Sequence, residues 1–375
     1  METENTLRLG DVFVGIPDPR QGTKVVHDLV ELLVVAVCSV LVGADTFVEI
    51  EEWAKDNLAW FRRHLKLENG IPSHDTFGRV FAMMDATAFG AAFQRWVKQI
   101  VPTLKKGEVV AIDGKTSRRS GAVGGTPLHM VSAFAAGAQL VLGQCATAEK
   151  SNEKTAIPEL LATLALEGCI VTIDAMGTQP NIAQAIRDRG ADYILSVKDN
   201  QPTLADAMRD FYAAFQLAPH KTPHQFNEVV EKDHGRLEVR RCHVFDQLDC
   251  LPAPERWPDL KSFAVIVSER TLKGKTSIEH RYYISSLPPD AAQLNHAVRQ
   301  HWAVETRLHW CMDVVFNDDQ MRARTDHAAH NLSVLRHFAL NLIRYAPVKR
   351  KGGLKVQRLR AASSVEYREI LLGLL

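Results

Sequence analysis

The sequence predicts an α/β protein in which a mixed β-sheet carries helices on both faces and follows a helical N-terminal region. Apolar residues recur at three- and four-residue spacing up to about residue 105. Short apolar runs then alternate with helical patterns to about residue 200, and strand-like patterns dominate residues 227–287. With 375 residues, 46% of them hydrophobic and 24% charged, the chain has room for one large core and smaller units.

Residues 1–105 are predicted to form a helical N-terminal domain. Helical spacing runs through three segments, which are 27–43, 46–65 and 76–101. Ser73 is a suitable N-cap before the third segment. A helix, a short turn and a second helix permit a DNA-reading helix-turn-helix, with Arg79 as the one residue that marks a recognition face. Plain helical packing explains the same pattern.

Residues 106–226 are predicted to form the first part of the sheet. The strands are expected in EVVAIDGKT, PLHMVSAFAA, LVLGQCATA, CIVTIDAMG and ADYILSVKDN, with a Gly-Ala-Gln turn joining the second and third. One helix, closing on Gly168 as its C-cap, precedes the fourth strand, and another precedes the fifth. A hairpin meander followed by strand–helix–strand units indicates a mixed sheet with helices on its faces.

The last third of the chain contains three more segments. Residues 227–288 are predicted to form a β-rich antiparallel unit with one turn at Lys273-Gly274-Lys275. Residues 289–345 return to helical spacing, and residues 346–375 are predicted to be a basic tail. The net charge of the whole chain is +1, but residues 299–375 hold 13 Lys/Arg and 7 Asp/Glu. Such a basic run is either a solvated face or a phosphate-binding surface.

Cysteine usage and hydropathy restrict the class of protein. The six cysteines are scattered without a C-x-x-C pair, as is typical of reduced thiols in a cytoplasmic protein. The apolar stretch from Leu32 to Ala44 is shorter than the ~20 residues that cross a bilayer. The N-terminus lacks the layout of a signal peptide. A cytoplasmic location without membrane association is therefore expected.

Two aspartates at strand ends carry the clearest chemical signal. Asp113 and Asp174 each end a run of the form V-x-I-D-small. If their strands are parallel neighbours, both lie at the carboxyl edge of the sheet, where ligands bind in open α/β folds, about 5 Å apart. Two such carboxylates repel each other unless a cation lies between them, and Mg²⁺ prefers oxygen ligands. Either aspartate alone is explained by capping a turn, whereas the matched pair favours a metal site.

A third acidic ligand is predicted on a helix. Glu305 lies at helical spacing with five other residues, which are Leu294, Val298, Trp302, His309 and Met312. A carboxylate on a buried face is costly unless it is paired or bound to metal. Arg299 and Arg307 are the alternative ion-pair partners, and Asp313 is the alternative third ligand. The histidines His301 and His309 are expected to support packing, because magnesium prefers oxygen.

Several segments together carry a family resemblance. They include VVAIDGKTSRRS, VTIDAMGTQ, DYILSVKDNQPTL and HWAVETRLHWCMDVVF, and matching segments follow in order from about Asp18 to Arg344. The chain thereby resembles the ISAs-type insertion-sequence transposases, which include the H-repeat-associated proteins. The resemblance implies an RNase H-like catalytic core with a five-stranded mixed sheet, formed by residues 106–226 and 289–345 and interrupted by the β-rich insertion.

The resemblance also implies the active site. Asp113, Asp174 and Glu305 take the three acidic positions of the DDE type, both as catalytic residues and as ligands of two Mg²⁺ ions, for which Mn²⁺ can substitute. Related transposases often carry a Tyr, an Arg and a Lys at fixed distances from the Glu. Those places hold Val298, His301 and Met312 here, so the phosphate-binding roles are not carried over.

The implied function is a DNA transposase of an insertion sequence that cuts the element ends and transfers them to target DNA. The expected partners are the terminal repeats, the target DNA and a second copy of the chain in a homodimer. Candidate phosphate contacts are Lys115, Lys198, Arg322 and Arg324. Two alternatives share these features: an RNase H-like nuclease without strand transfer, and a catalytically silent remnant that binds DNA.

Overall fold

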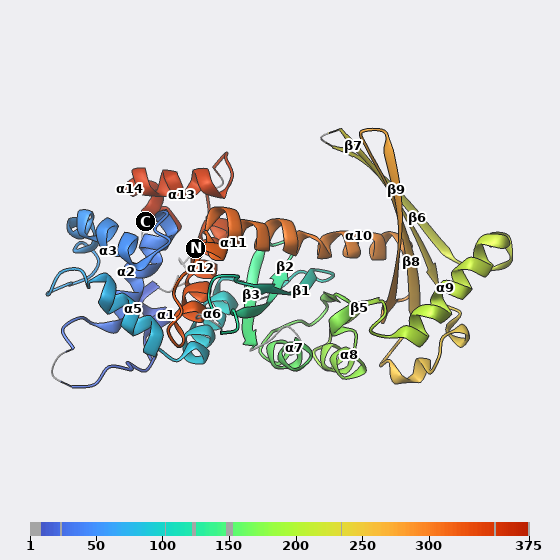
Figure 1. Ribbon diagram of the computed structural model, residues 1–375, viewed down its shortest axis with the longest axis horizontal. Coiled ribbons are helices and arrows are strands. Elements are labelled where there is room, and N and C mark those ends of the chain that lie inside the picture. The colour runs from blue at the N-terminus through green and yellow to red at the C-terminus, as the bar shows by residue number, and fades with distance from the viewer. Residues whose placement is uncertain are drawn as a thin grey trace, which may run out of the picture.

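The computed structural model describes residues 9–22, 25–101, 103–121, 125–147, 153–233, 235–348 and 350–373. Figure 1 shows three parts in a row. The helical body (α1–α6 and α12–α14) lies at one end and contains both marked ends of the chain. A sheet with helices on its two faces lies in the middle, and a twisted blade (β6–β9) lies at the other end.

The first helices of the helical body begin where the sequence offers capping side chains. They are α1 (Leu9–Phe13), α2 (Leu29–Val42), α3 (Phe47–Asp56), α4 (Leu58–Phe61), α5 (His74–Met83) and α6 (Ala86–Ile100). Asp28, Thr46 and Ser73 each accept a hydrogen bond from a backbone N–H in the first turn that follows. Ser73 is thus confirmed as an N-cap. Within the described ranges, α2 and α3 satisfy the criteria for a membrane span only as a pair bent by 95°, and no single helix does.

The predicted order of the central strands and helices is confirmed. The elements are β1 (Val109–Thr116), β2 (His129–Ala135), β3 (Leu140–Thr147), α7 (Glu153–Ala162), β4 (Ile170–Ile173), α8 (Pro180–Arg187) and β5 (Asp192–Val197). β1 pairs antiparallel with β2 and parallel with β4, which is parallel to β5. α7 and α8 lie on one side of this sheet and α10 on the other, so the mixed α/β prediction is confirmed (Figure 1).

The sheet has nine strands rather than the predicted five. The four strands of the blade, β6 (Gln225–Asp233), β7 (Arg236–Phe245), β8 (Ser262–Leu272) and β9 (Lys275–Ser285), continue it in the order β3-β2-β1-β4-β5-β9-β8-β7-β6. β9 pairs antiparallel with β5 along Ile194–Val197. The insertion thereby satisfies backbone groups that β5 would otherwise leave unpaired at an edge. The predicted turn at Lys273-Gly274 is confirmed, with positive φ at both residues.

Two local features differ from the sequence prediction. Gly168 does not cap α7, which ends at Ala162; instead it has a φ of 71° in the turn before β4 and donates its N–H to the carbonyl of Gly190 at 2.9 Å. Helix α9 (Pro202–Leu217) is not among the predicted elements. It covers one face of the blade, where the ring of Phe211 lies 5.0 Å from that of Phe245.

The last helices return the chain from the blade to the helical body. α10 (Ala291–His301) packs on the sheet face that carries Val109, Ile170 and Ile194. It is followed by a π-helical turn (Val304–His309) and α11 (Trp310–Val315). α12 (Ala328–Tyr345) is buried along most of its length and contacts α2, α5, α6 and β3.

The segment expected to be a basic tail contains two packed helices, α13 (Leu354–Ser363) and α14 (Val365–Leu371). Arg358 is 5% exposed and donates to Asp45 Oδ1 at 2.8 Å and to the Val40 carbonyl at 2.8 Å. Arg368 is 1% exposed and lies 4.3 Å from the ring centroid of Trp60. Carboxylates, carbonyls and aromatic faces can all accept a buried guanidinium. A count of charges cannot distinguish such arginines from exposed ones.

Candidate active site

Asp113 and Asp174 lie at the same level on neighbouring strands. β1 and β4 are parallel, and Ile112 pairs with Ile173, so each aspartate is the next residue along its strand. Strand spacing puts their backbones roughly 5 Å apart. The four residues before each aspartate are buried, and the Asp113 side chain is 17% exposed. Asp174 is exposed and also caps the short helix Ala175–Gly177 by accepting the Met176 N–H at 3.1 Å.

Glu305 lies on the π-helical turn, opposite the strand that carries Asp113. A π turn closes its hydrogen bonds over five residues instead of four, and such turns are frequent at functional sites. Leu294 and Met312 are buried as the sequence predicts, but the Glu305 side chain is 53% exposed. The prediction that Glu305 shares the buried stripe is therefore wrong, because the wider turn rotates it outward. Arg299 pairs with Glu231 at 3.3 Å rather than with Glu305.

His309 joins the first and third acidic residues. Its Nδ1 lies 3.6 Å from Asp113 Oδ2 and 3.4 Å from Glu305 Oε2. One ligand atom from each of these three residues lies within 4.8 Å of the others. The sequence contains a signal for this contact, since Glu305 and His309 are four residues apart on a helix. The expectation that His309 only supports packing does not describe its position beside both carboxylates.

The electrostatics of the cluster follow from burial and crowding. Burial raises the pKa of Asp113 to about 6; His309 opposes this shift, and the charges of Glu305 and Asp174 add to it. The pKa of Glu305 is lowered, chiefly by His309. Asp113 is therefore a buried carboxyl whose charged form a bound cation would stabilise.

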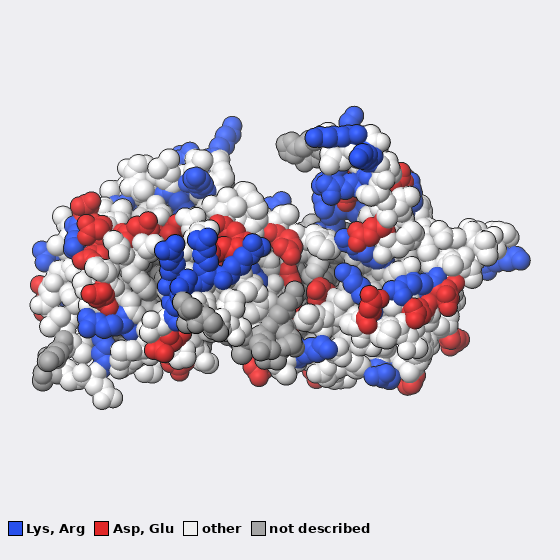
Figure 2. Space-filling model, viewed as in Figure 1, with Lys and Arg blue, Asp and Glu red and all other residues white. Residues whose placement is uncertain are grey.

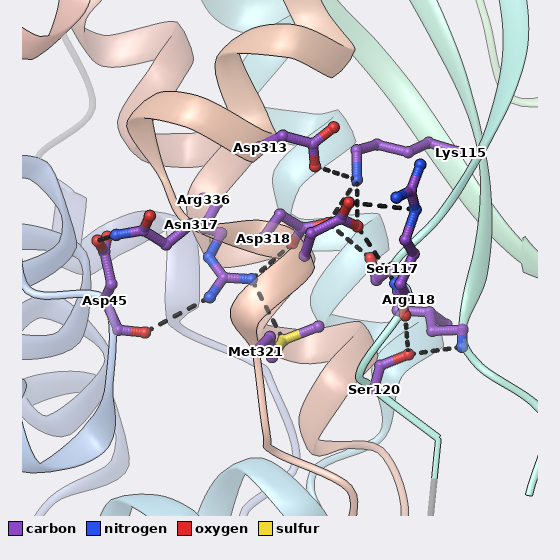
Figure 3. A network of polar contacts seen from close by, with 12 residues as sticks. Asp45, Lys115, Ser117, Arg118, Ser120, Asp313, Asn317, Asp318, Met321 and Arg336 are labelled. Carbon is purple, nitrogen blue, oxygen red and sulfur yellow. Dashed lines mark hydrogen bonds and ion pairs between the residues drawn. The ribbon is translucent and has the colours of Figure 1, made fainter.

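A network of ion pairs lies directly beside this cluster (Figure 3). Lys115, two residues after Asp113, places its ammonium 2.6 Å from Asp313 Oδ1, 3.1 Å from Asp318 Oδ2 and 3.5 Å from Asp319 Oδ1. The Lys115 side chain is only 12% exposed. Asp318 is further held by Arg336 at 2.6 Å and by the Ser117 hydroxyl at 2.6 Å. The predicted phosphate contact of Lys115 is untested, but its ammonium faces these carboxylates, and Asp313 is paired with Lys115.

Comparison with known proteins gives the family. Residues 104–342 match the Transposase DDE domain family, and residues 10–97 match the family described as DDE_Tnp_1-associated. The chain belongs to the DDE transposase family. It is 40% identical over 379 residues to YncI of Escherichia coli O157:H7, covering 97% of this chain and 94% of that one. It is 39% identical over 367 residues to the H repeat-associated protein YhhI of Escherichia coli K12, covering 94% of each. Both carry transposase in their names.

One solved structure is also similar to this DDE transposase. It is a piggyBac transposase synaptic complex with hairpin DNA, with a TM-score of 0.47 and 11% sequence identity. The similarity covers 97% of this chain and 76% of that one.

The other predicted phosphate contacts of the transposase lie on the surface around the cluster. Lys198 is exposed at the end of β5 and lines a small cavity of about 70 Å³ together with Asp174 and Arg281. Arg322 and Arg324 are exposed in the loop before α12. Arg324 donates to the Arg119 carbonyl at 3.0 Å, so this loop lies against the one that follows β1. These positions are compatible with the predicted roles and do not test them.

Two arginines beside this loop are absent from the sequence prediction. Arg118 is 83% exposed, and its N–H donates to Asp319 Oδ1 at 3.2 Å. The Arg119 guanidinium donates to Gln320 Oε1 at 2.5 Å. Figure 2 shows Lys and Arg side chains gathered beside acidic ones at the middle of the molecule. The segment TSRRS, which closely follows Asp113 in the sequence, contains both arginines and indicates basic residues near the first aspartate.

Related transposases often carry a Tyr, an Arg and a Lys at fixed distances from the Glu. In this chain those three positions hold no exposed cation. Val298 and Met312 are 6% and 2% exposed. Burial lowers the pKa of His301 to about 4, and its Nδ1 lies 3.0 Å from the Thr172 hydroxyl. Arg281 lies nearby, over the ring of Trp302 at 4.4 Å from the centroid. Arg281 thus supplies a positive charge beside Asp174 from a different element, β9.

Proposed function

We propose that this protein is an insertion-sequence transposase that cuts the element ends and joins them to target DNA, with Asp113, Asp174 and Glu305 as its catalytic acids. Two observations carry the proposal: Asp113 and Asp174 lie level on parallel strands, and ligand atoms of Asp113, His309 and Glu305 from a distant helix lie within 4.8 Å of one another. An RNase H-like core accounts for the order β3-β2-β1-β4-β5 within the larger sheet.

The donor set fits divalent cations. Carboxylate oxygens dominate it, and burial raises the pKa of Asp113, whose charged form a cation would stabilise. We propose Mg²⁺ as the cofactor, as two ions, with Mn²⁺ able to substitute and Asp113, Asp174 and Glu305 as the ligands. When bound, two such ions would activate the attacking oxygen and stabilise the leaving 3′-oxygen.

The chain's own residues perform the remaining tasks. His309 holds Glu305 and Asp113 in one orientation from the buried side of the helix. Exposed cations around the cluster contact DNA phosphates: Lys198, Arg118, Arg119, Arg322 and Arg324. The helical N-terminal domain, residues 1–105, contributes to binding of the element ends, and two chains pair in the DNA complex.

The test is cleavage of DNA that flanks the protein's own gene, with Mg²⁺ or Mn²⁺. The wild type should nick at the element ends, whereas Asp113→Asn, Asp174→Asn and Glu305→Gln should lose cleavage by more than about 10³-fold and retain end binding. Asp210→Asn, at an exposed position on α9, is the matched control. Metal-dependent nicking by Asp113→Asn would contradict the assignment. Pre-cleaved ends supplied with a target plasmid separate a transposase from a nuclease, because only the transposase joins them.

A further inference from the structure

A groove of about 600 Å³ lies beside Glu305 and has no part in the site described above. Its walls come from the β2–β3 turn at Gly137–Gln139, from Thr306 to Val315, from the end of α12 and from residues 350–357. Thr306 and Arg307, which line it, directly follow Glu305 in the chain, so the groove and the third acidic residue share one helical stretch. α11 and α13, which flank it, lie side by side (Figure 1).

The groove is positively charged. Its described lining residues include three arginines, Arg307, Arg344 and Arg350, and no Asp or Glu. Arg344 forms part of the floor and donates to the carbonyls of Gln139 and Arg307. Arg307 and Arg350 are exposed, and neither has an ion pair with a carboxylate in the part of the chain that the structure describes. A hollow lined by one sign of charge concentrates anions.

An exposed aromatic ring lines the same groove as these cations. Trp310 lines the groove and is 57% exposed, a large apolar surface to leave in water. Its backbone N–H donates to the Glu305 carbonyl, so Trp310 lies one π-helical turn after the third acidic residue. An aromatic face flanked by cations is the usual platform for a nucleobase of single-stranded DNA.

We propose that the groove binds one or two unpaired nucleotides of the strand that is cut, with a base stacked on Trp310 and phosphates held by Arg307 and Arg350. The volume of about 600 Å³ suits a ligand of this size. The proposal rests on the proposed function, because it assumes that the scissile phosphate lies at the acidic cluster.

The binding test uses a fluorescent twelve-nucleotide dT strand, alone and paired with its complement, without divalent metal. Trp310→Ala should weaken binding of the single strand by about 5- to 100-fold, the effect of losing one or two stacked bases, and duplex binding by less than about 3-fold. Trp310→Phe should retain most of the affinity. Phe226→Ala removes another exposed aromatic side chain, 51% exposed on the blade, and should change nothing.

Two further measurements identify the contacts. A 2-aminopurine in the dT strand should change its fluorescence on binding to the wild type and lose that change in Trp310→Ala. Arg307→Gln and Arg350→Gln should each lower the salt dependence of single-strand binding by about 0.7 in the log–log slope. Arg270→Gln, at an exposed position on the blade, is the control. Competition by inorganic phosphate alone, with no effect of Trp310→Ala, would show a phosphate site and overturn the nucleotide proposal.

The outcomes separate this inference from the proposed function. If Trp310→Ala binds the dT strand as the wild type does while the wild type cleaves element ends, the inference fails and the proposed function stands. If single-strand stacking on Trp310 is observed but the wild type never cleaves with Mg²⁺ or Mn²⁺, the proposed function fails instead.

Discussion

Asp113 is the residue at which folding and chemistry oppose each other. In the folded protein its pKa is raised to about 6 from an ordinary value of 3.8. The fold therefore favours the protonated carboxyl. Ionising Asp113 costs free energy in the folded protein but not in the unfolded chain, so it lowers the free energy of unfolding. This cost is absent below pH 3.8, grows as pH rises towards 6 and is complete above that value. A carboxylate whose charge destabilises the metal-free protein is typical of a cluster that binds a cation.

We expect Asp113→Asn to raise the Tm of the metal-free protein at pH 7.5 by a few degrees, because the amide removes an uncompensated charge worth at most about 2–3 kcal/mol. The gain should be smaller at pH 5, where the wild-type carboxyl is largely protonated. Calorimetry with EDTA measures both values. Added Mn²⁺ should stabilise the wild type and have little effect on the variant. A lower Tm for Asp113→Asn at pH 7.5 would show that the carboxylate is stabilising and not strained.

The sequence predicts the strand-end aspartates well and their neighbours poorly. Asp113 and Asp174 each end a buried apolar run. The local pattern therefore indicates that each lies at the end of a strand, at the carboxyl edge of the sheet and level with the other. Helical spacing indicates the contact of His309 with Glu305, whereas its contact with Asp113 joins residues far apart in the chain and follows only from the fold. The partners of Lys115 lie some 200 residues further along the chain, at Asp318 and Asp319. Side-chain pairing at that separation follows only from the assembled fold.

An ion pair joins strand β1 to the helical stretch Val304–Val315, in addition to the contact of His309 with Asp113. Lys115 follows Asp113 by two residues and so lies on the same face of β1. Asp313 follows Glu305 along the helix, and the Lys115–Asp313 distance is 2.6 Å. The pair thus connects the element that carries the first acidic residue to the element that carries the third. We expect Lys115 to act as a positioning residue, while its contact with a DNA phosphate stays a prediction from the sequence.

We expect Lys115→Met to lower the free energy of unfolding by roughly 2–4 kcal/mol, because Asp313, Asp318 and Asp319 lose a shared cation in a mostly buried position. Lys115→Met/Asp313→Asn should recover much of the loss, since Asp318 keeps Arg336 and Asp319 keeps Arg118. Urea denaturation of the two single variants and the double variant gives the coupling free energy.

DNA binding by the same variants distinguishes the two roles of Lys115. A positioning residue leaves the salt dependence of end binding unchanged in the double variant. A phosphate contact lowers the log–log slope by about 0.9 for duplex DNA. Additive stability changes together with a lower slope would assign Lys115 to DNA and remove it from the ion-pair network.

The elements divide in the same way into predictable and unpredictable ones. Periodicity indicates the five central strands and most of the helices, because each buries a face that recurs at its own spacing, but it does not indicate α9, α13 or α14. Whether the blade forms a separate unit or continues the sheet depends on the pairing of β5 with β9, about 90 residues apart. Periodicity likewise does not indicate the exposure of Glu305, because this residue lies on a π-helical turn within an otherwise regular helical pattern.

For the molecule as a whole, one polar network links the helical body to strand β1 (Figure 3). Arg358 of α13 bonds to Asp45 Oδ1 at 2.8 Å, and Asp45 Oδ2 accepts from Asn317 at 2.7 Å. Arg336 of α12 bonds to Asp318, which in turn holds Lys115. The last helices of the chain therefore support the loop after α2 and, through it, the end of β1. The basic composition of the C-terminal segment hides this structural role.

The stability of the whole molecule should depend on Arg358 and not on its exposed neighbours. Arg358→Ala leaves the Asp45 carboxylate and the carbonyls of Val40 and Val315 without their buried donor, so we expect a loss of about 3–5 kcal/mol in urea denaturation. Lys355→Ala, on the exposed side of the same helix, should stay within about 0.5 kcal/mol. Asp45→Asn/Arg358→Met removes both charges and should regain part of the loss. If Arg358 instead serves DNA, Arg358→Ala will melt like the wild type and bind DNA less tightly, and the C-terminal helices would then belong to the DNA-binding surface.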